Sequence, residues 1–140
     1  MTGAFRRILV PVDLTPKALG AARVAARVAG EGATLTLLHV IEKIGGGSSG
    51  LERFYRRLDA AARRKLEPVA VRLGRRGLKV RVVLVYGNRL REILRFAGET
   101  RCDLVVMASH RLDRNRPGGG WATLSYEVGL LSGPPVLLVK

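Results

Sequence analysis

The chain of 140 residues has the length of one domain and can bury a full hydrophobic core. Hydrophobic residues make up 47% and aromatic residues 5%, which excludes a disordered chain and predicts a core of Val, Leu, Ile and Ala. The formal net charge of +14 suggests nucleic-acid binding, but the basic residues are spread over many segments, which favours an ordinary solvated surface.

The single cysteine, Cys102, excludes a disulfide within the chain, as is typical of a reducing cytosol. Residues 1–7 lack the order of a signal peptide, and no apolar run approaches the roughly 20 residues that span a bilayer. We therefore expect a cytoplasmic protein without a membrane segment, folded as one domain over residues 1–140.

The first apolar run, Ile8–Val12, is short and rich in β-branched residues, which predicts a strand. Asp13 follows at the carboxyl end of this strand. Thr15 and Pro16 then predict a helix start, with Thr15 as N-cap and Pro16 as the first helical residue.

Small apolar residues keep helical spacing after Pro16, and Gly30 and Gly32 are expected to end that helix. Ala33–Val40 predicts the second strand, and the glycine- and serine-rich stretch at 43–50 predicts a loop. A long apolar stripe with three- and four-residue steps predicts a helix from Leu51 to about Arg76.

Pro68 is expected to kink this long helix about one turn earlier. Lys79–Tyr86 predicts the third strand, and Gly87 and Asn88 predict a turn and a helix cap. Leu90 begins the buried stripe of the helix that follows.

Asp103–Ala108 is almost continuously apolar, which indicates a central strand buried on both faces. A loop at 109–121 precedes a short helix over Thr123–Ser132. Prolines then interrupt the chain before Val136–Val139, the predicted fifth strand.

Strands and helices thus alternate along the whole chain, which predicts an α/β fold with a parallel sheet and helices on both faces. We expect the flavodoxin-like strand order 3-2-1-4-5. In that order a ligand crevice opens at the carboxyl ends of strands 1 and 4. The crevice would therefore contain Asp13 and the loop after Ala108.

Two interpretations of Asp13 remain open, a ligand acceptor and a turn-forming residue that binds nearby backbone amides. The loop at 109–121 combines glycines with arginines, including Arg111, and leads to the hydroxyls of Thr123 and Ser125. Glycines and a helix start suit a phosphate, but an ordinary surface loop has the same composition, and the Walker pattern is absent.

No arrangement of residues typical of an enzyme occurs in the sequence, so we expect no catalytic residues. His39 and His110 lack metal-ligand spacing, and a structural or solvent-facing role is expected for both. Cys102 is expected to be a buried, unreactive thiol. Asp13 would contact magnesium only through water or phosphate.

The segments Ile8–Asp13, Ala33–Val40, Asp103–Ser109 and Pro135–Lys140, in this order and spacing, resemble the universal stress protein family over essentially the whole chain. Many members of that family bind ATP. The resemblance implies that Pro11 and Asp13 flank the adenosine, that Val40 meets adenine, that Met107 and Ala108 line the pocket floor, and that Thr123, Leu124 and Ser125 meet phosphates.

The family's glycine motif is degenerate in this sequence. Ala108, Arg111 and Ala122 stand where the motif has glycines, the intervening stretch is one residue longer, and Thr123 keeps the Ser/Thr position. Alanine restricts positive φ values, and Arg111 would either crowd a triphosphate or bind it as a fork of donors.

The resemblance also implies a homodimer paired along strand 5, which would cover the apolar edge of Val136–Val139. The sequence therefore favours a non-catalytic, dimeric stress-response module that binds ATP, with magnesium, at the crevice between strands 1 and 4. A dimeric interaction module that has lost the nucleotide and acts on an unidentified protein partner is the alternative. Nucleic-acid binding through the basic surface has less support, and ATP hydrolysis has the least.

Overall fold

The computed structural model describes residues 5–43, 51–109 and 124–140. Strands and helices alternate in it as β1 (Phe5–Pro11), α1 (Pro16–Val28), β2 (Ala29–Ile41), α2 (Leu51–Gly74), β3 (Lys79–Tyr86), α3 (Arg89–Glu99), β4 (Leu104–Ala108), α4 (Leu124–Leu131) and β5 (Val136–Val139). The predicted loops at 43–50 and 109–121 lie almost entirely outside the described residues.

The five strands form one parallel sheet in the order β3-β2-β1-β4-β5, which confirms the predicted topology. β1 is the central strand, and Leu9 lies beside Thr36 of β2 and Val105 of β4. Because the winding direction reverses between β1 and β4, the connections after these two strands leave the sheet on opposite faces. A crevice is expected at that point.

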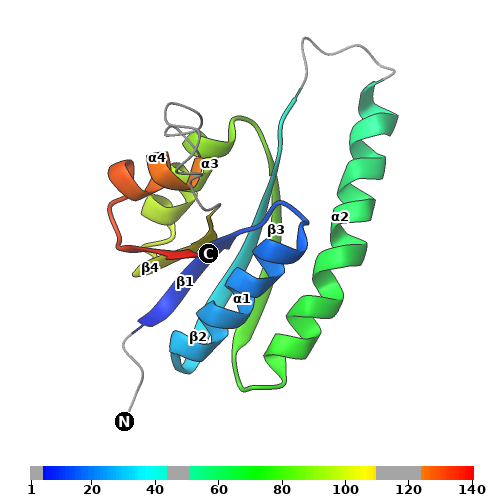
Figure 1. Ribbon diagram of the computed structural model, residues 1–140. Coiled ribbons are helices and arrows are strands. Elements are labelled where there is room, and N and C mark those ends of the chain that lie inside the picture. The colour runs from blue at the N-terminus through cyan, green and yellow to red at the C-terminus, as the bar shows by residue number, and fades with distance from the viewer. Residues whose placement is uncertain (1–4, 44–50, 110–123) are drawn as a thin grey trace, which may run out of the picture.

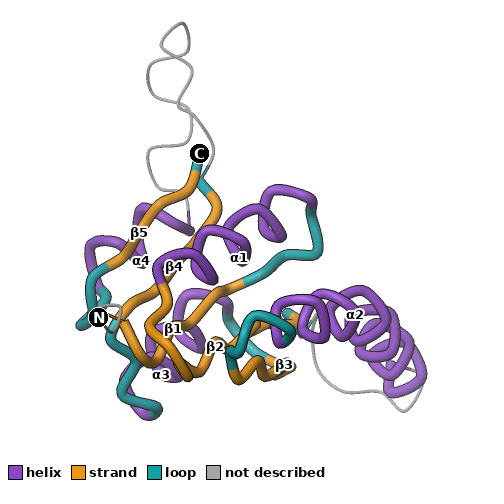
Figure 2. Tube along the Cα trace, turned by 90° about the horizontal axis from the view of Figure 1, so that it is seen from below, coloured by secondary structure: helices purple, strands orange, loops and turns teal. Residues whose placement is uncertain are grey.

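Helices cover both faces of the sheet (Figures 1 and 2). α1 and α2 pack on one face, where alanines of α1 such as Ala21 and Ala22 are fully buried beside Val10 and Leu66. α3 and α4 pack on the other face, where Ile93 joins a second buried cluster. The small α1 side chains let this helix approach the sheet closely.

The start of α1 confirms its sequence prediction, since Thr15 is the N-cap and Pro16 the first helical residue. The predicted end of α1 is wrong. Ala29 already has extended backbone and pairs with Phe5, so Gly30 lies inside β2. Gly32 adopts a φ of +72° where the register between β1 and β2 shifts, so this glycine serves the sheet and not the helix end.

The remaining boundaries agree with their predictions to within a few residues. α2 begins at Leu51 as expected and continues through Pro68 to Gly74. The bounds of β3 and β5 are those predicted. No helix among the described residues is long and apolar enough to cross a membrane.

Candidate functional site

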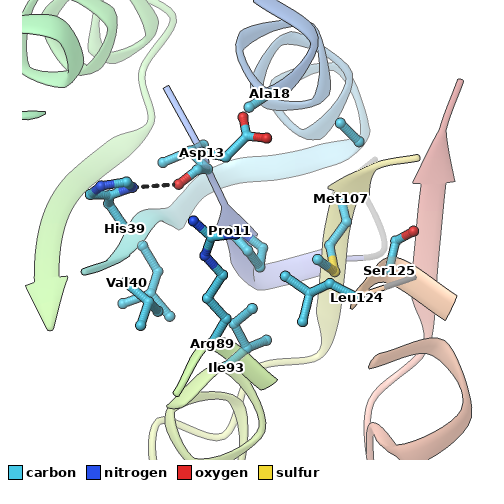
Figure 3. Close-up of a pocket in the computed structure, with 13 residues that line it drawn as sticks. Pro11, Asp13, Ala18, His39, Val40, Arg89, Ile93, Met107, Leu124 and Ser125 are labelled. Atoms are coloured by element: carbon cyan, nitrogen blue, oxygen red, sulfur yellow. Dashed lines mark hydrogen bonds between the residues drawn. The ribbon is translucent and has the colours of Figure 1, made fainter. Parts of the chain in front are cut away.

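A cavity of about 260 Å³ opens at the carboxyl ends of β1 and β4, where the topology predicts a crevice. Three strand ends, the start of α1 and the first turns of α3 and α4 surround it (Figure 3). Its lining residues are Pro11, Val12, Asp13, Ala18, Leu38, His39, Val40, Arg89, Ile93, Met107, Ala108, Leu124 and Ser125.

Asp13 is held in place by the turn that joins β1 to α1. Its Oδ1 accepts hydrogen bonds from the backbone N–H of Thr15 at 3.0 Å and from the Thr15 hydroxyl at 2.5 Å. Leu14, between them, has a φ of +69°, which costs an L-residue about 1 kcal/mol and is found where surrounding contacts impose it. Asp13 is therefore a turn-forming residue and also lines the cavity.

The Asp13 carboxyl has a pKa below its ordinary value. Partial burial works in the opposite direction, but the hydrogen bonds from Thr15 and from the Asp13 backbone amide, with the positive charge of Arg89, together outweigh it. Asp13 therefore carries a negative charge at neutral pH. Oδ2 accepts neither hydrogen bond from Thr15 and can accept one from a ligand hydroxyl.

Arg89 contributes a positive charge from the opposite side of the cavity. It is the first residue of α3, and its side chain points into the cavity (Figure 3). The turn before it depends on Gly87, whose φ of +146° is accessible to glycine, and on Asn88, whose side chain accepts a hydrogen bond from the Arg91 amide at 3.0 Å. Glu42 lies 3.9 Å from the guanidinium, a weak and half-exposed pairing.

His39 connects the ends of β2 and β1 at the cavity wall. Its Nδ1 lies 2.8 Å from the carbonyl oxygen of Val12, as the dashed line in Figure 3 marks. A carbonyl only accepts, so Nδ1 carries a proton; whenever the ring is neutral, its Nε2 is an acceptor. The expected structural role of His39 is thus confirmed, and the ring also lines the cavity.

Apolar side chains form much of the remaining wall. Val40 and Met107 are both 5% exposed, and Ile93, one helical turn after Arg89, is 2% exposed. Pro11 closes the space at the end of β1. Such a wall offers flat, dry contact to a planar apolar or aromatic group, with polar groups placed at its margins.

The first turn of α4 forms the margin beyond β4. Leu124 and Ser125 are its first residues, and the Ser125 hydroxyl donates to the hydroxyl of Ser109 at 3.4 Å. The Ser109 amide donates to the Val139 carbonyl at 2.8 Å, which fixes this serine at the sheet edge. The helix dipole makes such a helix start favourable to an anion.

The structure brings seven of the predicted site residues together around this cavity: Pro11, Asp13, Val40, Met107, Ala108, Leu124 and Ser125. Arg111 and Thr123 lie outside the described residues, as do Ala122 and His110. That any of these residues binds a nucleotide stays a prediction.

Sequence reasoning did not identify Arg89 and Ile93 as cavity residues. The topology contains a signal for both, because α3 follows β3 at the same sheet edge where β1 and β4 end. Arg89 is the first residue of that helix, and Ile93 follows four positions later, so both side chains lie on the same face of the helix. The spacing of residues along the chain does not indicate that the Arg89 side chain extends across β2 to the cavity.

Cys102 lies at the opposite sheet edge and is half-buried. Burial raises the pKa of its thiol, which keeps the group neutral and poorly nucleophilic. The described residues contain no cluster of three or more His, Cys, Asp or Glu side chains that could hold a metal ion.

Solved structures with the same fold include several stress proteins. The hypothetical protein MJ0577 superimposes with a TM-score of 0.79 at 27% identity, covering 96% of this chain and 95% of that one. A universal stress protein in complex with cAMP gives a TM-score of 0.71 at 17% identity, covering 99% and 98%. The universal stress protein from Archaeoglobus fulgidus in complex with dAMP gives 0.64 at 21% identity, covering 96% and 98%.

A comparison with curated proteins gives no match. The family model described as "Universal stress protein family" matches residues 4–120, which is most of the chain. The matched region runs from β1 past the end of β4 and so includes both strands that meet at the cavity. The chain therefore belongs to the universal stress protein family.

Proposed function

We propose that the protein is a non-catalytic, dimeric stress-response module that binds an adenine nucleotide, ATP with magnesium, in the cavity at the ends of β1 and β4. The observation that carries this proposal is the composition of that cavity: a dry apolar wall lies beside a charged carboxylate, an arginine and a helix start. Two relatives of the same fold are described in complex with cAMP and dAMP.

The apolar part of the cavity suits the base. Val40, Met107 and Ile93 present buried aliphatic surface on which an adenine ring would stack without losing hydrogen bonds of its own. In the neutral ring, His39 Nε2 is an acceptor that would match a donor such as an exocyclic amine. An adenine ring buries a large apolar area and would supply much of the binding free energy.

The charged part suits the ribose and phosphates. Asp13 Oδ2 would accept hydrogen bonds from ribose hydroxyls, which are donors and do not repel a carboxylate. Arg89 and the first turn of α4 would face the negative phosphates, and magnesium would be held by phosphate oxygens and water. The described residues that line this cavity therefore suit both the base and the ribose-phosphate part of the nucleotide.

Calorimetric titration of the nucleotide-stripped protein with ATP and magnesium, with AMP in parallel, tests the proposal. We expect saturable binding of one nucleotide per chain. Arg89→Gln should weaken ATP binding about tenfold, since it removes a charge-assisted contact. Asp13→Ala should weaken ATP and AMP alike, because both ligands contain the ribose.

Arg91→Gln is the matched control, because it makes the same charge change two residues away, on an exposed position outside the cavity. Its affinity for ATP should stay within about twofold of the wild type. Equal losses in both arginine variants would point to general attraction by the basic surface. No heat at millimolar nucleotide would favour the alternative function, a dimeric module that acts on a protein partner.

A specific observation supports the dimeric part of the proposal. β5 is an edge strand that exposes Leu137, and α4, which packs on the other face of the sheet from Leu137, exposes Tyr126, Leu130 and Leu131. An open strand edge beside exposed apolar side chains is a surface that pairing with a second copy would cover.

A further inference from the structure

A second cavity, of about 300 Å³, lies at the amino-terminal edge of the sheet, opposite to the proposed nucleotide site. We call it the amino-edge cavity. It is lined by Arg7, Ile8, Thr34, Thr36, Arg81, Thr100 and Cys102, and none of these residues lines the carboxyl-edge cavity.

Strand register explains why these polar side chains meet. Arg7 of β1 lies beside Thr34 of β2, and Thr36 of β2 lies beside Arg81 of β3. Side chains two residues apart on a strand share a face, so Arg7 shares the face of Leu9, which packs in the cluster under α3 and α4. α3 ends at Glu99 and covers only the other half of that face. The amino-terminal half of three strands is left as a polar hollow.

The arginines and a lysine of this hollow outnumber its nearby carboxylate, Asp103. Neither guanidinium, of Arg7 or of Arg81, forms a salt bridge within the described residues. Lys79 adds a third cation on the same strand face as Arg81 and lies beside Thr34. The neighbouring carboxylate, Asp103, accepts hydrogen bonds from the backbone amides of Arg6 and Arg7 at 2.8 and 2.9 Å.

Thr36 provides an independent indication of a ligand. Thr36 is only 4% exposed, yet its hydroxyl makes no hydrogen bond to any described residue. Every fully buried side-chain nitrogen and oxygen in the described ranges has a hydrogen-bond partner, so the Thr36 hydroxyl must reach the open space of the cavity. A hydroxyl that is accessible from the cavity, on a residue that is otherwise almost fully buried, can donate to a ligand there.

We propose that the amino-edge cavity binds the phosphate group of a small-molecule ligand. The two arginines supply planar forks of donors that match phosphate oxygens, and the hydroxyls of Thr34 and Thr36 supply further donors. Cys102 stays a neutral thiol and adds no opposing charge, because burial raises its pKa. The cavity volume is at the lower end for small-molecule sites.

Titration with inorganic phosphate and with phenyl phosphate, followed by backbone amide NMR at constant ionic strength, tests this proposal. We expect saturable shifts at Thr34, Thr36 and Cys102 at millimolar ligand. Arg81→Gln should lower the affinity about tenfold, and Thr36→Val, which keeps the side-chain shape, should lower it several-fold. Tighter binding of the ester would identify a phosphorylated molecule as the ligand, and equal binding would identify free phosphate; both support the site.

Arg23→Gln is the matched control, since it removes one exposed positive charge from α1 on the other face of the sheet. Phosphate affinity in this variant should stay within about twofold of the wild type. An equal loss in Arg23→Gln and Arg81→Gln would overturn the proposal, as would shifts confined to the carboxyl-edge residues Asp13 and Ser125. Binding of a single-stranded oligonucleotide in preference to both phosphate probes would also overturn it.

The two proposals fail independently. Arg81→Gln and Thr36→Val should leave ATP binding at the carboxyl edge unchanged, and Asp13→Ala should leave the phosphate shifts at Thr36 unchanged. Loss of ATP binding in all three variants would contradict the separation of the two cavities.

Discussion

Asp13 combines a local structural role with a place in the candidate site. The carboxylate accepts two hydrogen bonds from Thr15, whose own hydroxyl accepts from the Ala18 amide at 3.4 Å to cap α1. The strained Leu14 completes the turn. Both interpretations that the sequence left open for Asp13 are therefore compatible, because one carboxylate oxygen makes the turn and the other faces outward.

The lowered pKa of Asp13 predicts a stability contribution that is lost in acid. At neutral pH the carboxylate is ionised in the folded and unfolded states, and the contribution is complete. As the pH falls below the ordinary Asp pKa of about 3.9, the unfolded chain takes up the proton first, so the contribution is lost as the pH falls through the lower folded-state pKa.

Asp13→Asn should remove this pH dependence. We expect the variant to be less stable than the wild type at neutral pH by no more than about 1 kcal/mol, because the carboxylate is largely exposed and its charge interactions are screened. The difference should shrink as the pH falls below about 4. Urea unfolding at a series of pH values measures it, and a difference that stays constant into acid would contradict the assignment.

At the scale of one element, α3 has well-defined caps at both ends. Asn88 caps its start. At its end the Cys102 amide donates to the Ala97 carbonyl at 3.1 Å and the Arg101 amide to the Gly98 carbonyl at 3.3 Å, the pattern of a Schellman motif. That motif favours glycine at its left-handed position, but this chain has Arg101 there, with a φ of +52°.

Arg101→Gly should therefore stabilise the protein by about 0.5–1 kcal/mol, equivalent to a rise in Tm of about 2–4 °C. Arg101→Ala is the control, because it also removes the exposed charge but keeps the Cβ that disfavours this conformation. Thermal unfolding at a fixed protein concentration measures both variants. A similar gain in Arg101→Ala would show that charge relief, and not backbone strain, explains the effect.

At the scale of the whole molecule, one end of the sheet is apolar and open. Among the described residues β5 pairs with β4 alone, and its Leu137 is 37% exposed. Leu130 and Leu131 of α4, which packs on the other face of the sheet from Leu137, are 67% and 61% exposed. With a net charge of +14, two copies of the chain repel each other over most of their surfaces. Pairing is therefore expected at this apolar end.

Leu137→Lys should convert the proposed homodimer to monomers at micromolar concentration, since it places a charge in the apolar interface of each copy. Val71→Lys is the control, because Val71 is 60% exposed on α2, away from β5. Sedimentation velocity measures the oligomeric state. A monomeric wild type, or equal dissociation of both variants, would contradict pairing along β5.

Much of the fold and part of the site could be predicted from sequence. Alternating apolar runs and helical stripes give the element order, and the capping pair Thr15 and Pro16 gives the start of α1, because these signals are local. The end of α1 was wrong because Gly30 looks the same in a helix cap and in a strand. Only the pairing of its neighbour Ala29 with Phe5 of β1 shows that the strand has already begun.

The sequence by itself determined the fold class, the strand order and the sheet edge at which Asp13 stands, because hydrophobic periodicity and the short connections leave few topologies. Only the tertiary structure decided that Arg89 reaches the carboxyl-edge cavity and that Arg7, Thr36 and Arg81 share a hollow at the amino edge. These groupings depend on strand register and on where α3 ends, and neither can be predicted from the spacing of residues along the chain.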